Sequence, residues 1–147
     1  MGGEASTADL AAIRRGFELF NAGDLDALHS EVFDPEIDYS GDPQISVLTG
    51  LPVEVKGGRE VLAVWEGFFA MFDDVSATEI AVEPTPDGPV LGSCRMLARG
   101  GASEVPIDAL FHFAWVLRDE RWRFMAVKLR RDEVERALAD WLRSSRR

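Results

Sequence analysis

The chain has 147 residues, with 26 acidic and 16 basic side chains and a net charge of −10. This length fits one domain, which can bury about two-thirds of the surface of the unfolded chain. Hydrophobic residues at 46% and charged residues at 29% exclude a globally disordered protein. Because an acidic chain repels phosphate backbones and anionic lipids, we expect neither nucleic acid nor a membrane as a partner.

Several classes of site lack their sequence signals. The single cysteine, Cys94, cannot form an internal disulfide. The soft metal ligands His29, His112 and Cys94 have no metal-binding spacing, and no glycine-rich nucleotide motif is present, so we expect no metal and no cofactor. The N-terminus lacks the apolar core of a signal peptide, which favours a cytoplasmic location. Arg outnumbers Lys 14 to 2, as is typical of a GC-rich bacterial source.

The first part of the chain has a helical pattern. Ser6 and Asp9 form a capping-box signal, and Gly23 ends the helix that follows. Asp24 begins a short second helix, which stops before Asp34-Pro35, and residues 36–40 are expected to form a strand. The apolar residues of the first helix recur at helical spacing: Leu10, Ile13, Phe17 and Phe20.

Residues 41–58 form the one long irregular connection, with four glycines, two prolines and no sustained period. Connections of this kind are often lids or binding loops. A helix is expected over 59–72, with an apolar face made of Val61, Leu62, Trp65, Phe68, Phe69 and Phe72.

The rest of the chain has a β pattern. Strands are expected at about 75–83, 89–99, 104–117 and 121–130, and a last helix at about 132–142. Helices followed by a meander predict an α+β fold with one antiparallel sheet and helices on one face. We expect a single domain over 1–147, with its core at about 7–142 and a disordered basic tail at 143–147.

The strand at 104–117 carries the best site candidates. Its odd positions are the more hydrophobic and its even positions carry the polar groups, which predicts an apolar packing face and a face that lines a partly polar cavity. A two-residue turn at Asp119-Glu120 would place Arg123, Met125 and Val127 on the face of His112. A similar turn at 101–102 would place Asp108 opposite Arg95 as an ion pair, and a slip of one residue would reverse the faces.

Three side chains are candidates for proton transfer. His112 carries an imidazole, the side chain best suited to proton transfer at neutral pH, although a hydrogen-bonded core histidine explains it equally well. Asp108 is a second candidate, beside the alternative of a structural ion pair with Arg95. Asp38 shares a strand face with Ser40, whereas Tyr39 lies on the opposite face, and the sequence leaves open which face meets the cavity.

A family resemblance rests on these motifs. The stretch 14–28, which reads RRGFELFNAGDLDAL, resembles the opening of the SnoaL-like branch of the nuclear transport factor 2-like superfamily. Gly58-Arg59-Glu60 at a helix start resembles the next feature of that branch. Trp115, the Arg118-Asp119 turn and Arg131-Asp132-Glu133 at the closing helix follow in the same order, so that the resemblance covers about 10–142.

The resemblance implies a cone-shaped, cystatin-like fold, in which a curved antiparallel sheet wraps around the N-terminal and central helices and a short helix closes the chain. It also implies a deep pocket for a small apolar organic molecule and a homodimer through the outer sheet face. That face would carry Phe111, Phe113, Trp115, Trp122 and Phe124. The pocket would be lined by Tyr39, Ser40, Trp65, Phe69, Arg95, Leu110, Arg123 and Met125.

The superfamily includes ketosteroid isomerases, polyketide cyclases and non-catalytic binding proteins, so the fold leaves the function open. By alignment, the isomerase general base falls on Ser40 and its oxyanion tyrosine on Gly16, whereas its oxyanion aspartate falls on His112 or Asp108. One hypothesis is cofactor-free proton transfer on an apolar carbonyl compound, with catalytic residues His112, Asp108 and Asp38. The alternative is a non-catalytic ligand-binding or dimeric interaction module.

Overall fold

The structure is a computed structural model that describes residues 5–102 and 105–145. Helices and strands follow each other in an order close to the one expected from the sequence, with two additional elements, α3 and β2, between 41 and 58. The elements are α1 Thr7–Ala22, α2 Leu25–Ala27, the π-helical turn η1 Leu28–Val32, β1 Phe33–Ser40, α3 Pro43–Thr49, β2 Glu54–Lys56, α4 Gly58–Met71, β3 Asp74–Pro84, β4 Val90–Arg99, β5 Ile107–Arg118, β6 Arg121–Lys128 and α5 Arg131–Ser145.

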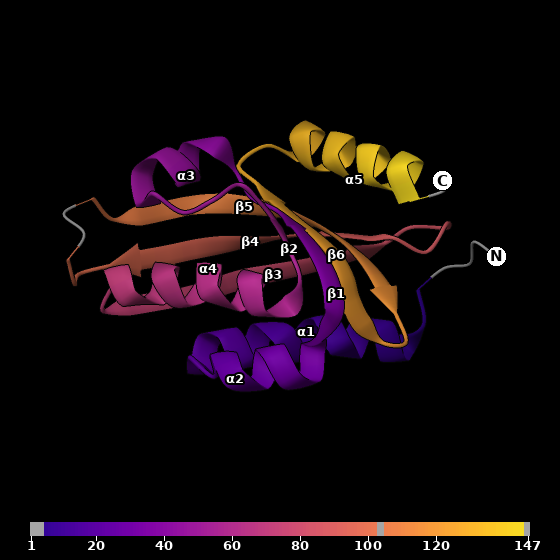
Figure 1. The fold of residues 1–147 in the computed structure, drawn as a ribbon, viewed down its shortest axis with the longest axis horizontal. Coiled ribbons are helices and arrows are strands. Elements are labelled where there is room, and N and C mark those ends of the chain that lie inside the picture. Colours follow the sequence, from indigo (N-terminus) through magenta and orange to yellow (C-terminus); the bar gives the residue numbers. More distant parts are fainter. Residues whose placement is uncertain (1–4, 103–104, 146–147) are drawn as a thin grey trace.

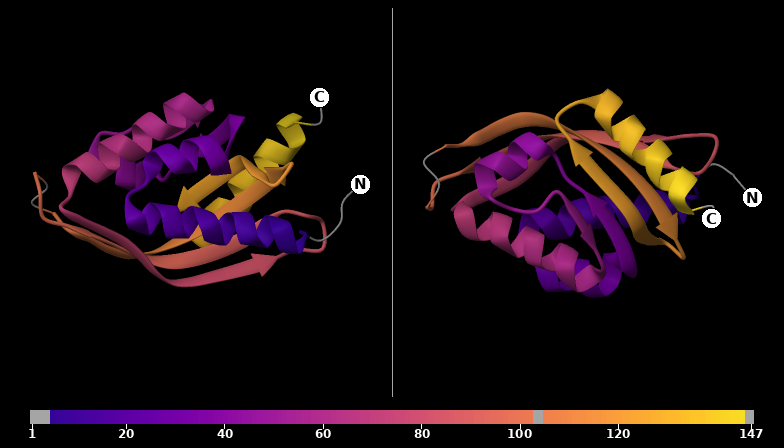
Figure 2. Two further views of the ribbon diagram at one scale, coloured as in Figure 1. Left: turned by 90° about the horizontal axis from the view of Figure 1, so that it is seen from below. Right: turned by 45° about the horizontal axis from the view of Figure 1, so that its top comes forward.

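One six-stranded sheet in the order β2-β1-β6-β5-β4-β3 forms the centre of the molecule. The sheet curves around α1, α2 and α4 on its concave face, and α5 packs on the opposite, convex face (Figures 1 and 2). The α+β class and the curved sheet are therefore confirmed. The sheet is mixed rather than wholly antiparallel, because β1 runs parallel to β6. This pairing joins segments far apart in the chain, which no local pattern reveals.

Local signals set the first helix as expected. Ser6 and Asp9 form the complete capping box, and Gly23 ends α1 in the left-handed conformation at φ 71°. The Asn21 side chain then fixes the edge strand β3: its Nδ2 donates to the Ala77 carbonyl at 3.0 Å, and its Oδ1 accepts from the Ala77 amide at 2.7 Å. The end of α1 is thus bound directly to the sheet.

A β-bulge in β6 decides which residues of that strand face the helices. Leu117 pairs with Trp122, but Val116 pairs with Phe124, so Arg123 is an extra residue in its strand. From the bulge onward Trp115 pairs with Met125, and His112 pairs with Lys128 rather than with Val127. The expected register was wrong by one residue for this reason. The odd positions of β5 face the helices, and the bulge places Met125 and Val127, rather than Phe124, on the same face as these positions. The even positions of β5 lie on the convex face.

The expected dimer surface is largely internal. Phe113 and Trp115 pack edge-on against Phe17 of α1, with ring centroids 5.5 and 5.9 Å away, and Phe111 and Trp122 are also buried. Phe124 does lie on the convex face, but Trp141 of α5 stacks on it at 4.9 Å. The assignment of these five residues to an outer interface was wrong, since it took the even positions of β5 as the cavity side, and the unbulged register grouped Phe124 with the other four residues. Association of two copies stays a prediction.

Two segments that were expected to be irregular or disordered contain helix or strand. The connection 41–58 contains the helix α3 and the short strand β2. The last helix extends to Ser145, so residues 143–145 of the expected basic tail are helical, while 146–147 lie outside the described residues. In the part of the chain that the structure describes, no helix is both long and apolar enough to span a bilayer.

Candidate functional site

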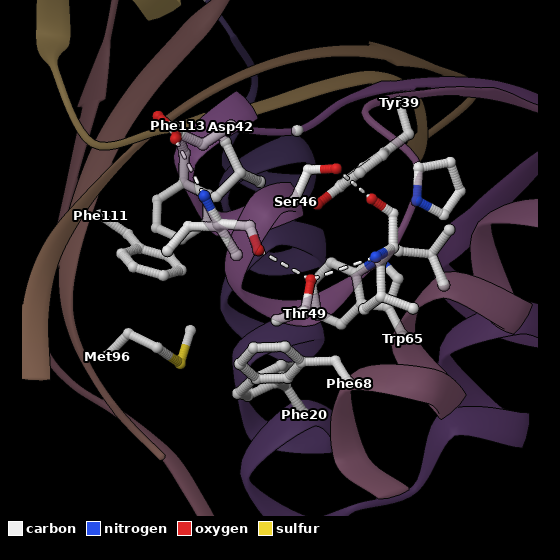
Figure 3. Close-up of a pocket in the computed structure, with 16 residues that line it drawn as sticks. Phe20, Tyr39, Asp42, Ser46, Thr49, Trp65, Phe68, Met96, Phe111 and Phe113 are labelled. Carbon is white, nitrogen blue, oxygen red and sulfur yellow. Dashed lines mark hydrogen bonds between the residues drawn. The ribbon is translucent and has the colours of Figure 1, made fainter. Parts of the chain in front are cut away.

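A hollow opens on the concave side of the sheet, between the strands, α4 and the short helix α3 (Figure 3). Its volume is about 600 Å³, counted with its open mouth. Aromatic and aliphatic side chains make up most of the wall, as in pockets for small organic molecules. The lining residues are Phe20, Tyr39, Gly41, Asp42, Ile45, Ser46, Thr49, Leu51, Pro52, Val64, Trp65, Phe68, Met96, Phe111, Phe113 and Val127.

The buried carboxylate of Asp42 holds α3 over the hollow. Its Oδ1 caps α3 by accepting from the amides of Gln44 at 2.7 Å and Ile45 at 3.3 Å. Its Oδ2 accepts from the Leu129 amide at 2.8 Å, just beyond the end of β6. The helix that covers the hollow is therefore tied to the sheet by a carboxylate with no free oxygen.

The polar side chains of α3 are used within the covering segment itself. Thr49 Oγ1 donates to the Ile45 carbonyl at 2.8 Å and accepts from the Leu51 amide at 3.3 Å. The Ser46 hydroxyl donates to the Leu51 carbonyl. These bonds close α3 and the following turn into one unit, and they leave few polar groups free to meet a ligand.

Tyr39 supplies the free polar group of the hollow. Its residue pairs with Met125, so the ring projects to the concave face, where it lies 6.4 Å from the ring of Trp65. Burial, with the negative charges of Asp42 and Glu54, raises the pKa of Tyr39 well above 10. Among residues 5–102 and 105–145, the Tyr39 hydroxyl has no hydrogen-bond partner. A neutral phenol that can donate thus faces an apolar space.

Trp65 adds a second unpartnered donor. The indole packs edge-on against Phe20 at 5.1 Å, and its buried Nε1 has no hydrogen-bond partner in the described residues. Buried polar groups normally have partners, so an acceptor placed near this N–H would remove an energetic cost.

The structure places only part of the expected lining at the hollow. Tyr39 and Trp65 do line it. Phe69 and Met125 lie on the same side of the sheet but pack into the core, Phe69 at 5.0 Å from the ring of Phe20. These four residues share the concave side because of the bulge in β6 and the apolar face of α4.

Three other expected residues lie beneath α5, on the convex face. Asp38 Oδ2 accepts from Arg123 Nη1 at 3.1 Å and from Trp141 Nε1 at 2.7 Å. The Ser40 hydroxyl donates to Glu54 Oε2 at 2.5 Å. Asp38, Ser40 and Arg123 are thus separated from the hollow by the sheet itself.

The remaining expected residues also lie on the convex face. The Arg95–Asp108 ion pair is confirmed, with two hydrogen bonds of 2.9 Å. Leu110, which pairs with Arg95, is 53% exposed. His112 lies between Ser93 and Lys128 on this face. The expected catalytic side chains His112, Asp108 and Asp38 therefore do not line the hollow.

No cluster of three His, Cys, Asp or Glu side chains that could hold a metal ion occurs in the part of the chain that the structure describes.

Comparison with known proteins identifies the family. The SnoaL-like domain model matches residues 13–125. The chain belongs to the SnoaL-like family. A search of curated proteins found no match.

Solved structures show the same fold. Bal32a, from a soil-derived mobile gene cassette, is 21% identical, with a TM-score of 0.71 over 82% of this chain and 87% of that one. A putative isomerase from Bacillus subtilis is 13% identical, with a TM-score of 0.70 over 90% and 93%. TerC, co-crystallised with polyporic acid, is 13% identical, with a TM-score of 0.66 over 88% and 97%.

The sequence offered some signal for the lining residues of this SnoaL-like chain that were missed. Asp42-Pro43 is a helix-start pattern, an N-cap followed by proline at the first helical position, and it precedes Ile45, Ser46 and Thr49. Phe111 and Phe113 were recognised as strand residues but placed on the wrong face, because the polar groups at the even positions of β5 favoured that other face as the cavity wall.

Proposed function

We propose that the protein binds a small, largely apolar organic molecule with a hydrogen-bond acceptor, such as a carbonyl oxygen, in the hollow on the concave face. The observation that carries this proposal is the unpartnered Tyr39 hydroxyl in a wall of aromatic and aliphatic side chains. An acceptor near that hydroxyl would fix the orientation of the ligand, while burial of its apolar surface would supply most of the affinity.

The lining favours binding over proton-transfer catalysis. Tyr39 and Asp42 are the ionisable residues among its lining residues. The oxygens of Asp42 already accept three backbone amides, and a raised pKa keeps Tyr39 neutral, so neither is placed as a general base near pH 7. The similar fold of TerC, co-crystallised with polyporic acid, supports an organic ligand in this fold class.

The test is a fluorescence titration with prodan, a neutral naphthyl ketone whose emission shifts to shorter wavelength when it leaves water. Ile45→Trp enlarges a side chain that lines the hollow, and Val47→Trp makes the same change at an 88% exposed position of the same helix. We expect Ile45→Trp to weaken prodan binding at least tenfold and Val47→Trp to leave it within twofold. Equal binding by wild type and Ile45→Trp, both with native circular dichroism, would refute a ligand in this hollow.

A further inference from the structure

A second cavity, a groove, lies on the convex side of the sheet, between α5 and the strands β1, β2 and β6. It is an open groove of about 1090 Å³, counted with the solvent at its mouth. The chain contains two lysines against 14 arginines, and both lysines, Lys56 and Lys128, line this groove. The remaining lining residues are Asp38, Tyr39, Ser40, Pro43, Glu54, Val55, Phe124, Glu133, Arg136, Ala137, Asp140, Trp141 and Ser144.

Lys128 is buried, with 8% of its surface exposed, and its amine is held in a defined orientation. Nζ donates to Ser40 Oγ at 2.9 Å and to the Gly41 carbonyl oxygen. The hydroxyl proton of Ser40 is directed to Glu54 Oε2, so Ser40 accepts from Lys128 rather than donating to it. These two bonds use two of the three substituent positions on the nitrogen. In the described residues no acceptor meets the third position.

The third position determines the chemistry of the amine. In the ammonium form it carries a third proton, and in the neutral amine it carries the lone pair. Lys128 forms no ion pair within residues 5–102 and 105–145, and Glu54 reaches it only through Ser40. Burial lowers the pKa of Lys128, and the attraction of Glu54, Asp42 and Glu133 offsets only part of this effect. The neutral, nucleophilic form is therefore easier to reach than in an exposed lysine.

Other groups of the groove indicate what kind of molecule fits beside the amine. The carboxylates of Asp38 and Asp140 form ion pairs with Arg123 and Arg143, respectively. Of the other two carboxylates of the groove, Glu54 accepts from the Ser40 hydroxyl and Glu133 lies 3.9 Å from Arg130. Lys56 and Arg136 form no ion pair with the described residues, so these two cations can meet an anion. The stacked rings of Phe124 and Trp141 offer an apolar surface next to these charges.

We propose that Lys128 is the nucleophile of a second site, which binds a small aldehyde or ketone bearing an anionic group and forms an imine with it. The Nζ lone pair forms a bond to the carbonyl carbon while the carbonyl π electrons move to the oxygen, which takes up one of the two Nζ protons. The resulting carbinolamine loses this hydroxyl as water, and the nitrogen gives up a proton as the C=N bond forms. Ser40 and Glu54 are positioning residues, since they orient Nζ without contacting the carbonyl compound.

Reductive trapping tests this proposal on the folded chain. The protein is incubated with 4-carboxybenzaldehyde and sodium cyanoborohydride, and the modified amines are located by peptide mass spectrometry. Lys56 serves as the internal reference in the same groove. We expect Lys128 to be modified at least tenfold faster than Lys56, and benzaldehyde, which lacks the carboxylate, to react at least fivefold more slowly at Lys128. Modification of Lys56 at a rate equal to or above that of Lys128 would overturn the proposal, as would an unmodified Lys128. Equal rates with both aldehydes would overturn the proposal that the carbonyl compound bears an anionic group.

Two sets of variants separate reactivity from a structural role. Lys128→Arg keeps the charge but cannot form the imine, and should show no adduct at 128 with native circular dichroism. Glu54→Gln removes an attraction for the ammonium, so the midpoint of the trapping rate against pH should move to lower pH. The charged and titratable groups around this amine are Glu54 and Lys56 of β2, Asp38 of β1, His112 of β5, Asp42, and Glu133, Arg136 and Asp140 of α5. An unmoved midpoint would show that Glu54 does not influence the amine. Ile45→Trp changes the hollow and not the groove, so it should leave the trapping of Lys128 unchanged. Failure of the trapping test and failure of the prodan test can therefore be told apart.

Discussion

Asp38 has the side chain of a general base, but its carboxylate stabilises the fold. The sequence indicated it as a candidate base, but its carboxylate accepts hydrogen bonds from Arg123 and from the indole N–H of Trp141. The guanidinium of Arg123 also lies 5.4 Å from the centroid of the Trp141 ring. A carboxylate that accepts from a cation and from a half-buried indole stabilises the contact of α5 with the sheet, and it is poorly placed to take a proton from a ligand.

Tyr39 is the one residue of the expected set that is both ionisable and placed in the hollow. Because it is the only tyrosine in the chain, alkaline titration of phenolate absorbance reports on it alone. The folded protein keeps the phenol protonated at pH values where the unfolded chain releases the proton, near 10. Stability should therefore be unaffected by this group at lower pH and fall as the pH rises above about 10.

We expect no phenolate absorbance below the pH at which circular dichroism reports unfolding. Half-ionisation near pH 10 in a chain that is still folded would contradict the burial of Tyr39.

At the scale of elements, the bulge in β6 separates what the sequence predicts from what it does not. Period and turn signals predicted β3 to β6 within a few residues, since alternation and glycine-containing turns are local properties. The single extra residue Arg123 is stabilised instead by distant partners, Asp38 and the Glu36 carbonyl. Its position moves Met125 and Val127 to the face of the odd positions of β5 and Phe124 to the opposite face, which the unbulged register does not predict.

The contact between α1 and β6 depends on Gly16. A Cβ atom at this position would lie 2.2 Å from Cζ2 of the buried Trp122 indole. Gly16→Ala should lower the free energy of unfolding by about 1–3 kcal/mol through overpacking, despite the roughly 1 kcal/mol that alanine adds to helix propensity.

Denaturant unfolding measures this effect. The control is Trp122→Phe, alone and combined with Gly16→Ala, because a smaller ring should make room for the new methyl group. Similar losses for Gly16→Ala in the wild-type and Trp122→Phe backgrounds would contradict this packing.

At the scale of the whole molecule, the sheet separates two cavities of different chemistry, the hollow and the groove. The concave face holds an apolar hollow with Tyr39, and the convex face holds a charged groove with Lys128. The sequence predicted the element order, the SnoaL-like family and the polar residues, but it merged the two regions into one pocket. Asp38, Ser40 and Arg123 were assigned to the hollow because neither the parallel pairing of β1 with β6 nor the position of α5 follows from local patterns.

The hollow on the concave face is the proposed ligand site. Methionine methyl NMR tests it directly, since Met96 lines the hollow and Met71, at the end of α4, does not. During titration with prodan, the Met96 methyl signal should shift and saturate while the Met71 signal stays in place. Saturable prodan binding that leaves the Met96 signal unmoved would place the ligand elsewhere and refute binding in the hollow.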